Sequence, residues 1–172
     1  MMITTPRLIL RPMHASDFAA LLLIFRDPLV MAAFNHPPFT DEQMHAWLQR
    51  NLDHQAHYGY GLYAIIEHTS GDLIGDCGLE MMELDDGTTA AELGYDLRSN
   101  YWGRGYATEA ALAVREYAFT MLNLPRLISL IRVGNLASQT VARKVGMKLT
   151  NTFMRGDVAY WQYEISNPHQ EI

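Results

Sequence analysis

The run Asn-Tyr-Trp-Gly-Arg-Gly-Tyr-Ala-Thr-Glu-Ala-Ala at residues 100–111 joins a strand-like segment at 91–97 to a helix-like segment at 107–122. Gly103 and Gly105 let the backbone turn sharply and leave room for a ligand to approach the main chain. The first N–H groups of the following helix have no partner inside the helix. With the positive end of the helix dipole they make an anion site that suits phosphate. We therefore expect a phosphorylated cofactor at this turn.

Two common nucleotide-binding turns do not fit this run. A dinucleotide-binding fold has Gly-x-Gly-x-x-Gly directly after a strand. Here Thr108 stands at the third glycine position, and five residues separate Leu97 from Gly103. A P-loop has Lys followed by Ser or Thr after its last glycine, whereas Tyr106 follows Gly105. The turn therefore indicates a different class of phosphate ligand.

The run Trp-Gly-Arg-Gly-Tyr-Ala at 102–107 resembles the pyrophosphate loop of the GNAT superfamily of acyl-CoA-dependent N-acetyltransferases, usually written Q/R-x-x-G-x-G/A. Trp102 stands at the Gln/Arg position, Gly105 at the glycine and Ala107 at the Gly/Ala position. The residue sequence of this loop is most similar to the branch that includes the ribosomal-protein N-terminal (Rim-type) acetyltransferases. In that branch a residue other than Gln or Arg at the position of Trp102 is normal. The opening Thr-x-Arg-Leu-Ile-Leu-Arg-Pro at 5–12 resembles the same branch.

The resemblance covers residues 7–165 and implies an α/β (α+β) GNAT fold, a mixed and splayed central sheet of about six to seven strands flanked by helices. We expect residues 1–172 to form a single domain, because one domain usually takes ~100–200 residues. The tail from about residue 167 is predicted to be disordered.

Local patterns predict the individual elements. Thr40 and Gln43 form a capping box that begins a helix ending near Tyr58. An apolar segment on both sides of the helix at 107–122 predicts a strand–helix–strand crossover and a parallel pair. The remaining strands are expected at 5–12, 60–67, 73–83, 89–97, 126–133, 148–155 and 158–165, with turns at 69–72, 85–87 and 156–157.

The resemblance assigns the cofactor-binding residues. The strand that carries Tyr95, Asp96 and Leu97 splays from its neighbour and pairs through its main chain with the pantetheine arm. Asn135 hydrogen-bonds that arm through its side chain; the alternative is a helix N-cap, and for Asn135 both roles can hold at once. The residues expected around the phosphates of acetyl-CoA are Trp102, Gly103, Arg104, Gly105, Tyr106, Ala107, Thr108, Arg143 and Lys144.

Three residues are candidates for proton transfer. An amine that attacks a thioester must lose a proton, and Glu92 is the candidate general base. The alternative for Glu92 is an exposed strand carboxylate in an ion pair. Ser138 is the candidate acid that protonates the leaving thiolate, or a plain first-turn residue, and Tyr160 is the reserve acid. Main-chain N–H groups near Leu93 to Tyr95 are expected to polarise the thioester carbonyl.

By the same resemblance, the early helical pair forms a wall of the acceptor groove, with candidates Phe34, Asn35, His36 and Phe39. Loop and core packing is the alternative for all four. Arg7 and Arg11 are expected to be solvated strand arginines rather than ligands of substrate or cofactor. His54 and His57 are expected at the surface, since no His-Glu-x-x-His pattern or cysteine ligand indicates a metal.

Composition excludes several function classes. The net charge of −6 argues against a general nucleic-acid binder. Cys77 is the single cysteine, so no intramolecular disulfide forms and a reducing compartment is indicated. No apolar run reaches membrane-spanning length. We expect a cytoplasmic protein, and the resemblance adds a homodimer as an expectation.

The sequence therefore predicts an acetyl-CoA-dependent N-acetyltransferase that works by direct attack in a ternary complex. The expected acceptor is the N-terminal α-amine of a protein or peptide. The alternatives are a small-molecule amine of the aminoglycoside or polyamine type, and a non-catalytic acyl-CoA binding or sensor protein.

Overall fold

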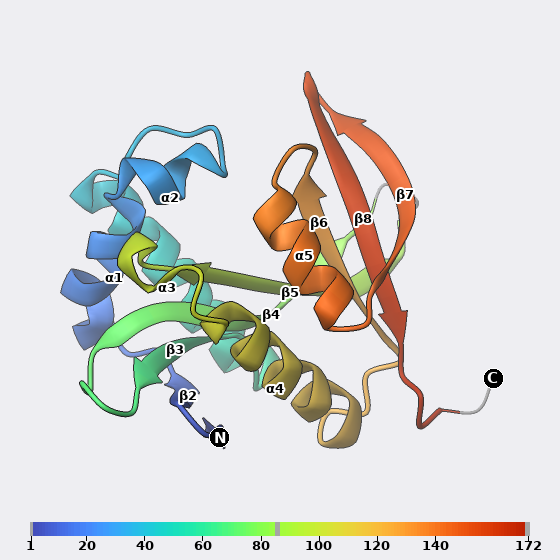
Figure 1. Ribbon diagram of the computed structural model, residues 1–172, viewed down its shortest axis with the longest axis horizontal. Helices are drawn as coiled ribbons and strands as arrows, with labels where there is room; N and C mark the ends of the chain where they lie inside the picture. Colours follow the sequence, from blue (N-terminus) through green and yellow to red (C-terminus); the bar gives the residue numbers. More distant parts are fainter. Residues whose placement is uncertain (1, 85–86, 171–172) are drawn as a thin grey trace.

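The computed structural model describes residues 2–84 and 87–170, within which the chain forms an eight-stranded sheet flanked by helices (Figure 1). The strands are β1 Ile3–Thr4, β2 Leu8–Pro12, β3 Leu62–Glu67, β4 Leu73–Glu83, β5 Thr89–Leu97, β6 Arg126–Arg132, β7 Lys148–Arg155 and β8 Val158–Ser166. The helices are α1 Phe18–Phe25, α2 Pro28–Ala32, α3 Asp41–Tyr58, α4 Tyr106–Thr120 and α5 Leu136–Lys144, with short 3-10 turns at Ala15–Asp17 and Ser99–Tyr101.

The strand order is β1-β2-β3-β4-β5-β6-β8-β7. This arrangement confirms the predicted mixed sheet, the meander of β3, β4 and β5, and the closing hairpin of β7 and β8. The sheet has one strand more than the upper expectation, because the two-residue β1 pairs with β2. The turn expected at 85–87 falls partly on residues 85 and 86, which lie outside the described residues.

β5 and β6 are parallel and separate soon after they meet. Their pairing consists of Ala91 with Leu127 and Glu92 with Ile128. Beyond this point β5 runs across the view of Figure 1, whereas β6 and β8 stand nearly upright. The predicted splay is therefore present, and it leaves the backbone of β5 after Glu92 without a neighbouring strand on the β6 side.

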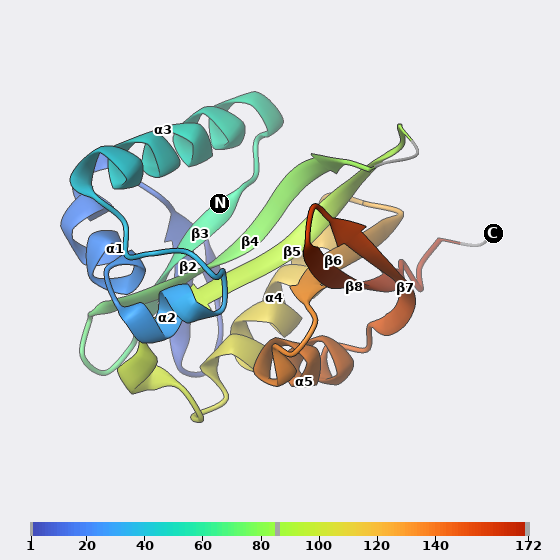
Figure 2. The same cartoon turned by 90° about the horizontal axis from the view of Figure 1, so that it is seen from above.

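Two apolar clusters hold the helices against opposite faces of the sheet. α1 and α3 pack on one face around Leu21, Met44 and Leu48. α4 packs on the other face around Ala110, Val114 and other buried side chains. Figure 2 shows α3 along one side of the sheet and α4 and α5 along the other. Because helices cover both faces of the sheet, a cavity at the splay can be lined by residues from both faces.

α3 begins at the predicted capping box, since the Thr40 side chain accepts from the Gln43 N–H and the Gln43 side chain accepts from the Thr40 N–H. His54 corrects the prediction of a surface histidine. Its Nδ1 is 3.2 Å from the Tyr60 carbonyl, and its Nε2 accepts from the Met81 N–H over 2.9 Å. His54 thus ties α3 to the part of β4 that extends past β3.

Arg11 also departs from its expectation. Its guanidinium forms a two-pronged ion pair with the Asp17 carboxylate at 2.8 and 2.7 Å. Burial alone would raise the pKa of Asp17, but the hydrogen bonds from Arg11 and the His14 N–H outweigh it and lower that pKa. Arg11 therefore fastens β2 to the start of α1.

The first residues of the tail are packed, in contrast to the predicted disorder from residue 167. Asn167 is 3% exposed, and its side-chain amide donates to the carbonyls of Phe119 and Leu124. Gln170 donates to the Asn123 carbonyl. The Asn167 amide thus satisfies two carbonyls at the C-terminal end of α4 and just beyond it, and it holds in place a segment whose composition alone predicts disorder. None of the described helices is long and apolar enough to span a bilayer.

Candidate active site

The loop between β5 and α4 has the conformation that its glycines allow. Gly103 has φ +74° and Gly105 has φ +81°, in the left-handed region that side chains disfavour. Gly105 is the N-cap of α4, so the N–H groups of Tyr106, Ala107 and Thr108 have no acceptor within the helix. These donors and the helix dipole favour an anion at the loop.

Arg7 and Glu109 brace this loop from the N-terminal strands. The Arg7 Nε donates to Glu109 Oε2 over 2.6 Å, and its Nη1 donates to the Arg104 carbonyl over 2.9 Å. The guanidinium lies 4.5 Å from the centre of the Tyr106 ring. Thr5 also donates to Glu109, over 2.6 Å. Arg7 is therefore not a merely solvated arginine: it connects β2, the glycine loop and α4.

A cavity of about 770 Å³, the loop cavity, lies against this turn. Its lining includes most of the residues that the sequence assigned to the cofactor: Tyr95, Asp96, Leu97, Trp102, Gly103, Gly105, Tyr106, Ala107, Thr108, Asn135, Ser138 and Lys144. The sequence did not single out Tyr101 or Arg132, which also line it. The loop cavity thus combines helix N–H donors with one lysine on a neighbouring helix.

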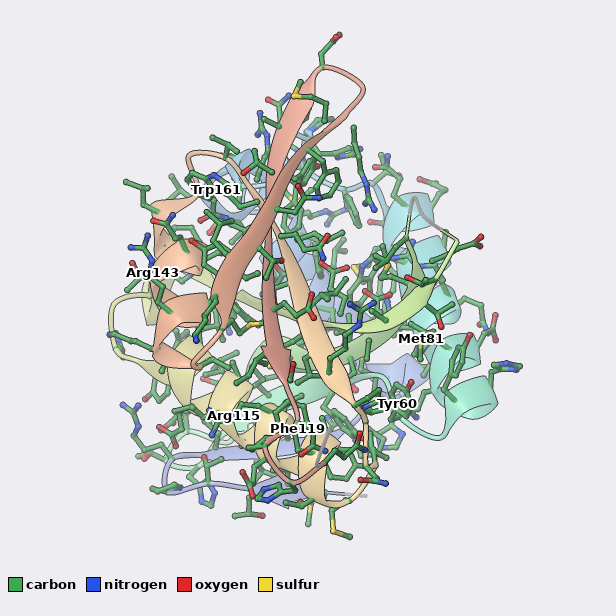
Figure 3. The ribbon with its side chains drawn as sticks, turned by 90° about the vertical axis from the view of Figure 1, so that its right-hand side faces the viewer. Tyr60, Met81, Arg115, Phe119, Arg143 and Trp161 are labelled. Carbon is green, nitrogen blue, oxygen red and sulfur yellow. The ribbon has the colours of Figure 1, made fainter. Side chains whose placement is uncertain are left out.

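Two residues that were expected to contact phosphate, Arg104 and Arg143, do not line the loop cavity. Arg104 extends over the Tyr101 ring, with its guanidinium carbon 5.3 Å from the ring centre. Arg143 lies on the outer side of α5, away from β4 (Figure 3). Since α5 turns Lys144 rather than Arg143 toward the loop cavity, neighbouring positions on one helix differ in what they can reach.

The backbone of β5 turns toward the splay at alternate residues. The Leu93 carbonyl accepts from Ser129 Oγ over 2.7 Å, and the Leu97 carbonyl accepts from the Trp102 indole over 2.8 Å. Because alternate residues direct their backbone groups to the same side of a strand, the N–H and C=O of Tyr95 face the splay as well. The carbonyl of Leu97 is already occupied by Trp102, so Tyr95 offers the more open pairing site.

Asn135 and Ser138 begin α5 beside this strand. Asn135 Oδ1 accepts from the Ser138 N–H over 3.1 Å, as an N-cap does. The Tyr95 hydroxyl donates to the Ser138 carbonyl over 3.3 Å. These contacts link α5 to β5 across the splay, and the N-cap role expected as an alternative for Asn135 is present.

A second cavity of about 520 Å³, the inner cavity, passes through the splay. Ala142 and Val145 of α5 line it on one side of the sheet, and aromatic residues of the α1–α3 segment line it on the other. Those aromatic residues are Phe25, Phe34, Phe39 and Trp47. The three predicted residues Phe34, His36 and Phe39 are thus at a cavity wall, whereas Asn35 is not among the lining residues.

Glu92 lies in the inner cavity at the point where β5 and β6 part. Its Oε1 accepts from the Leu130 N–H over 3.0 Å. Burial raises the pKa of Glu92 to about 7; the Leu130 N–H opposes this rise, and the neighbouring Glu80 adds to it. No ion pair to Glu92 is present among the described residues. Glu92 is therefore not the exposed, paired carboxylate of the alternative hypothesis.

The two cavities meet at four of the predicted residues. Tyr95, Asp96, Asn135 and Ser138 line both of them. Tyr160 lines the inner cavity only, and its ring stacks on Phe153. A ligand held at the glycine loop and a second ligand in the inner cavity would thus meet beside Ser138.

Sequence reasoning missed two carboxylates on β4, Asp76 and Glu80, which line the inner cavity. The register pairs Asp76 with Asp96 and Glu80 with Glu92. Two acidic residues four apart in a run that is otherwise apolar were the available signal, since alternation places them on one face. Cys77 points to the opposite face and is fully buried. No group of three or more His, Cys, Asp or Glu side chains suited to a metal ion occurs among the described residues.

Comparison with known proteins bears on this arrangement. A profile described as an acetyltransferase (GNAT) domain matches residues 7–148. The chain is 36% identical over 135 residues to the uncharacterized N-acetyltransferase p20 of Bacillus licheniformis. The matched region covers 78% of this chain and 75% of p20. It is 31% identical to the crystal structure of an acetyltransferase from Agrobacterium tumefaciens, with a TM-score of 0.83 over 99% of this chain and 95% of that one.

More distant structures share the fold with two kinds of named acceptor. RimL, a ribosomal L7/L12 α-N-protein acetyltransferase in complex with coenzyme A, has a TM-score of 0.79 at 22% identity, over 96% of this chain and 98% of that one. Spermidine N-acetyltransferase from Vibrio cholerae, in complex with CoA and spermine, has a TM-score of 0.74 at 17% identity, over 95% and 97%. At these identities the likeness concerns the fold.

Proposed function

This chain belongs to the GNAT family of acetyltransferases, and we propose that it transfers an acetyl group from acetyl-CoA to a primary amine by direct attack in a ternary complex. The observation that carries the proposal is the junction of two cavities at Tyr95, Asp96, Asn135 and Ser138. One cavity has the anion-binding loop, and the other has a buried carboxylate whose pKa is near neutrality. Direct transfer needs both ligands at such a junction.

The loop cavity is the proposed acetyl-CoA site. The free N–H groups at the start of α4 suit the pyrophosphate, and Lys144 supplies a positive charge at the same cavity. The Tyr95 N–H and C=O suit the amides of the pantetheine arm, which can pair with a strand that has lost its neighbour. Two structures that share the fold were solved in complex with CoA and support this assignment.

Glu92 is the proposed general base. The amine nitrogen forms a bond to the thioester carbonyl carbon, the carbon–sulfur bond breaks, and the proton of the amine passes to Glu92 directly or through a water. A carboxylate with a pKa of about 7 accepts this proton more readily than an ordinary glutamate does.

Ser138 is the proposed acid that protonates the departing thiolate. It lines both cavities, whereas Tyr160 lines only the inner one. A group that meets the sulfur of a bound thioester should lie where the cofactor and acceptor spaces join. Tyr160 stays the reserve candidate. A serine hydroxyl can also stabilise the sulfur by a hydrogen bond without full proton transfer.

The acceptor is proposed at the level of a primary amine, with a protein N-terminal α-amine as the hypothesis from the Rim-type resemblance. Fold neighbours include both a protein acetyltransferase and a spermidine acetyltransferase, so small amines stay in the test. The cytoplasmic location and the homodimer also stay predictions.

The test is release of CoA thiol from acetyl-CoA with short peptides, diamines and aminoglycosides as acceptors. We expect amine-dependent turnover in the wild type, with a loss of about 100-fold or more in kcat for Glu92→Gln and a smaller loss for Ser138→Ala. Glu83→Gln, an exposed carboxylate on β4 outside both cavities, is the matched control. Tight binding of acetyl-CoA with no release for any amine would instead favour the non-catalytic acyl-CoA binder.

A further inference from the structure

The floor of the inner cavity carries four carboxylates in two rows. The β4–β5 register pairs Asp76 with Asp96 and Glu80 with Glu92. Between these rows it pairs Gly78 with Gly94. All six positions alternate with residues on the opposite face, so the four acidic side chains project toward the same side of the sheet. The proposed base Glu92 belongs to one row, and the Asp76–Asp96 row has no part in the reaction described above.

Asp76 has no hydrogen-bond partner in the part of the chain that the structure describes. It is 0% exposed, and both of its carboxylate oxygens lack a hydrogen-bond partner among the described residues. Its neighbour on β3 is Ala64, and its neighbour on β5 is another carboxylate. A buried polar group without a hydrogen bond costs on the order of 1–3 kcal/mol. This side chain nevertheless borders the inner cavity.

No protein cation neutralises this row. Among the described residues, Asp76 and Asp96 make no ion pair with any arginine, lysine or histidine. Arg50, His36 and Arg132 line the same cavity; Arg50 and His36 are exposed and Arg132 is half-buried, whereas Asp76 is buried. Burial, and the proximity of the two carboxyls to one another and to Glu80, raise the pKa of both Asp76 and Asp96. A cation bound beside the row would favour the charged form of both carboxyls.

The space between the two rows is open over Gly94 but closed over Gly78, where an added Cβ would lie 2.1 Å from the Gly61 carbonyl oxygen. A Cβ added at Gly94 would meet no atom within 4 Å. The cavity walls opposite the carboxylates are aromatic, with Phe25 centred 4.7 Å from Trp47 and 5.2 Å from Phe39. Such walls suit a methylene chain and the face of an ammonium group. The Asp76–Asp96 row, the open position at Gly94 and the Glu80–Glu92 row thus follow one another along the strands.

We propose that Asp76 and Asp96 form a second cation subsite of the acceptor, so that the preferred acceptor carries an additional ammonium group beside the amine that is acetylated. The proposal rests on the proposed function, since it takes the inner cavity as the acceptor site. The reacting amine lies over Gly94, within reach of Glu92, and the second ammonium binds the Asp76–Asp96 row. Two residues along a strand span about 7 Å, which corresponds to about four or five methylene groups between the two nitrogens.

The kinetic test compares diamines with monoamines of matched length. Thiol release is measured with 1,4-diaminobutane, 1,5-diaminopentane, butylamine and pentylamine for the wild type, Asp76→Asn and Asp96→Asn. We expect the ratio of kcat/KM for a diamine over its monoamine to fall about tenfold or more in each variant, through KM, because one charged hydrogen-bonding partner is lost. Glu83→Gln should keep the wild-type ratio. An unchanged ratio in both aspartate variants would overturn the subsite.

A binding test separates this proposal from the proposed function. The diamines are titrated calorimetrically into the protein saturated with CoA, which cannot react. Weaker diamine binding by about tenfold in Asp76→Asn supports the subsite even if no amine is acetylated. Equal affinity in wild type and variant, or no diamine binding to the wild type at millimolar concentration, would overturn it.

A third set of acceptors, short peptides, shows whether the second charge belongs to a peptide side chain or to a free diamine. Peptides that begin with Lys-Ala or Ala-Lys carry a second ammonium, and peptides that begin with Ala-Ala do not. A preference for the lysine peptides that is lost in Asp76→Asn places the second charge on a peptide side chain. Preference for diamines over all peptides assigns it to a free polyamine-like acceptor. Equal use of Ala-Ala peptides, with wild-type kcat/KM in both aspartate variants, would contradict a dicationic acceptor.

Discussion

The N–H of Leu130 donates to the carboxylate of Glu92 over 3.0 Å, across the point where β5 and β6 part. The two strands pair only through residues 91–92 and 127–128, so this side chain takes a donor that a continuing strand would have used. The same separation that opens the sheet therefore holds the proposed base in a fixed place. Four predictions follow from this and from the neighbouring contacts.

The first prediction concerns pH. Burial raises the pKa of Glu92 to about 7, and the proposed base acts only when deprotonated. We expect kcat/KM to increase with pH through about 7 and to level off above it, falling about tenfold per pH unit on the acidic side. Glu92→Gln should lose this limb, and Glu83→Gln should keep it. A profile that is flat between pH 5.5 and 8 in the wild type would contradict the assignment.

The second prediction concerns the brace of the glycine loop. Arg7→Ala removes the contacts to Glu109 and the Arg104 carbonyl, so the loop N–H groups are held less firmly. We expect KM for acetyl-CoA to rise about fivefold while kcat changes less than twofold, because an exposed ion pair contributes modestly. Steady-state kinetics at saturating amine measures both. Arg26→Ala, which breaks the surface pair with Asp41, is the matched control and should leave both constants unchanged.

The third prediction concerns the open space at Gly94. Its φ lies outside the left-handed region and no atom lies within 4 Å of an added Cβ. Gly94→Ala should therefore leave the melting temperature equal or slightly higher, while the methyl group raises KM for the amine several-fold. Gly75→Ala is the contrasting variant, since its Cβ would lie 2.2 Å from the Asp96 carbonyl oxygen, and it should lower the melting temperature. An unaltered amine KM in Gly94→Ala would place the acceptor elsewhere.

The fourth prediction concerns stability. The pKa of Asp76 in the folded protein is raised by burial and by Asp96 and Glu80, so the folded state binds more protons than the unfolded state above pH 4. The contribution of Asp76 to stability is therefore complete below its unfolded pKa and is lost as pH rises toward the folded pKa. Asp76→Asn has no proton to lose and should be more stable than the wild type at pH 8.

Urea unfolding of both proteins at pH 4.5, 6 and 8 measures this difference. It should grow with pH, and a constant difference would show that the folded pKa of Asp76 is ordinary. A variant that is more stable and binds diamines less well would also indicate that Asp76 is kept for its ligand rather than for the fold.

The positions missed from the sequence are those decided by long-range contacts. Asp76 meets Asp96 only through the register of β4 and β5, and Arg7 meets Glu109 across 102 positions of the chain. His54 was assigned to the surface because the Met81 N–H that it binds lies on a distant strand. Arg104 and Arg143 were assigned to the phosphates from local position, yet the direction of a side chain depends on the packing of its helix or loop.

Local features follow directly from the sequence: the left-handed turns at Gly103 and Gly105, the capping box of Thr40 and Gln43, and the strand–helix–strand crossover. Each depends on backbone preferences and on hydrogen bonds between residues close in the chain. Long-range packing sets which side chains share the inner cavity, and it places Ser138 where the two cavities join. Those placements follow from strand register and helix packing, in which a shift of one residue would turn every side chain of a strand to the opposite face.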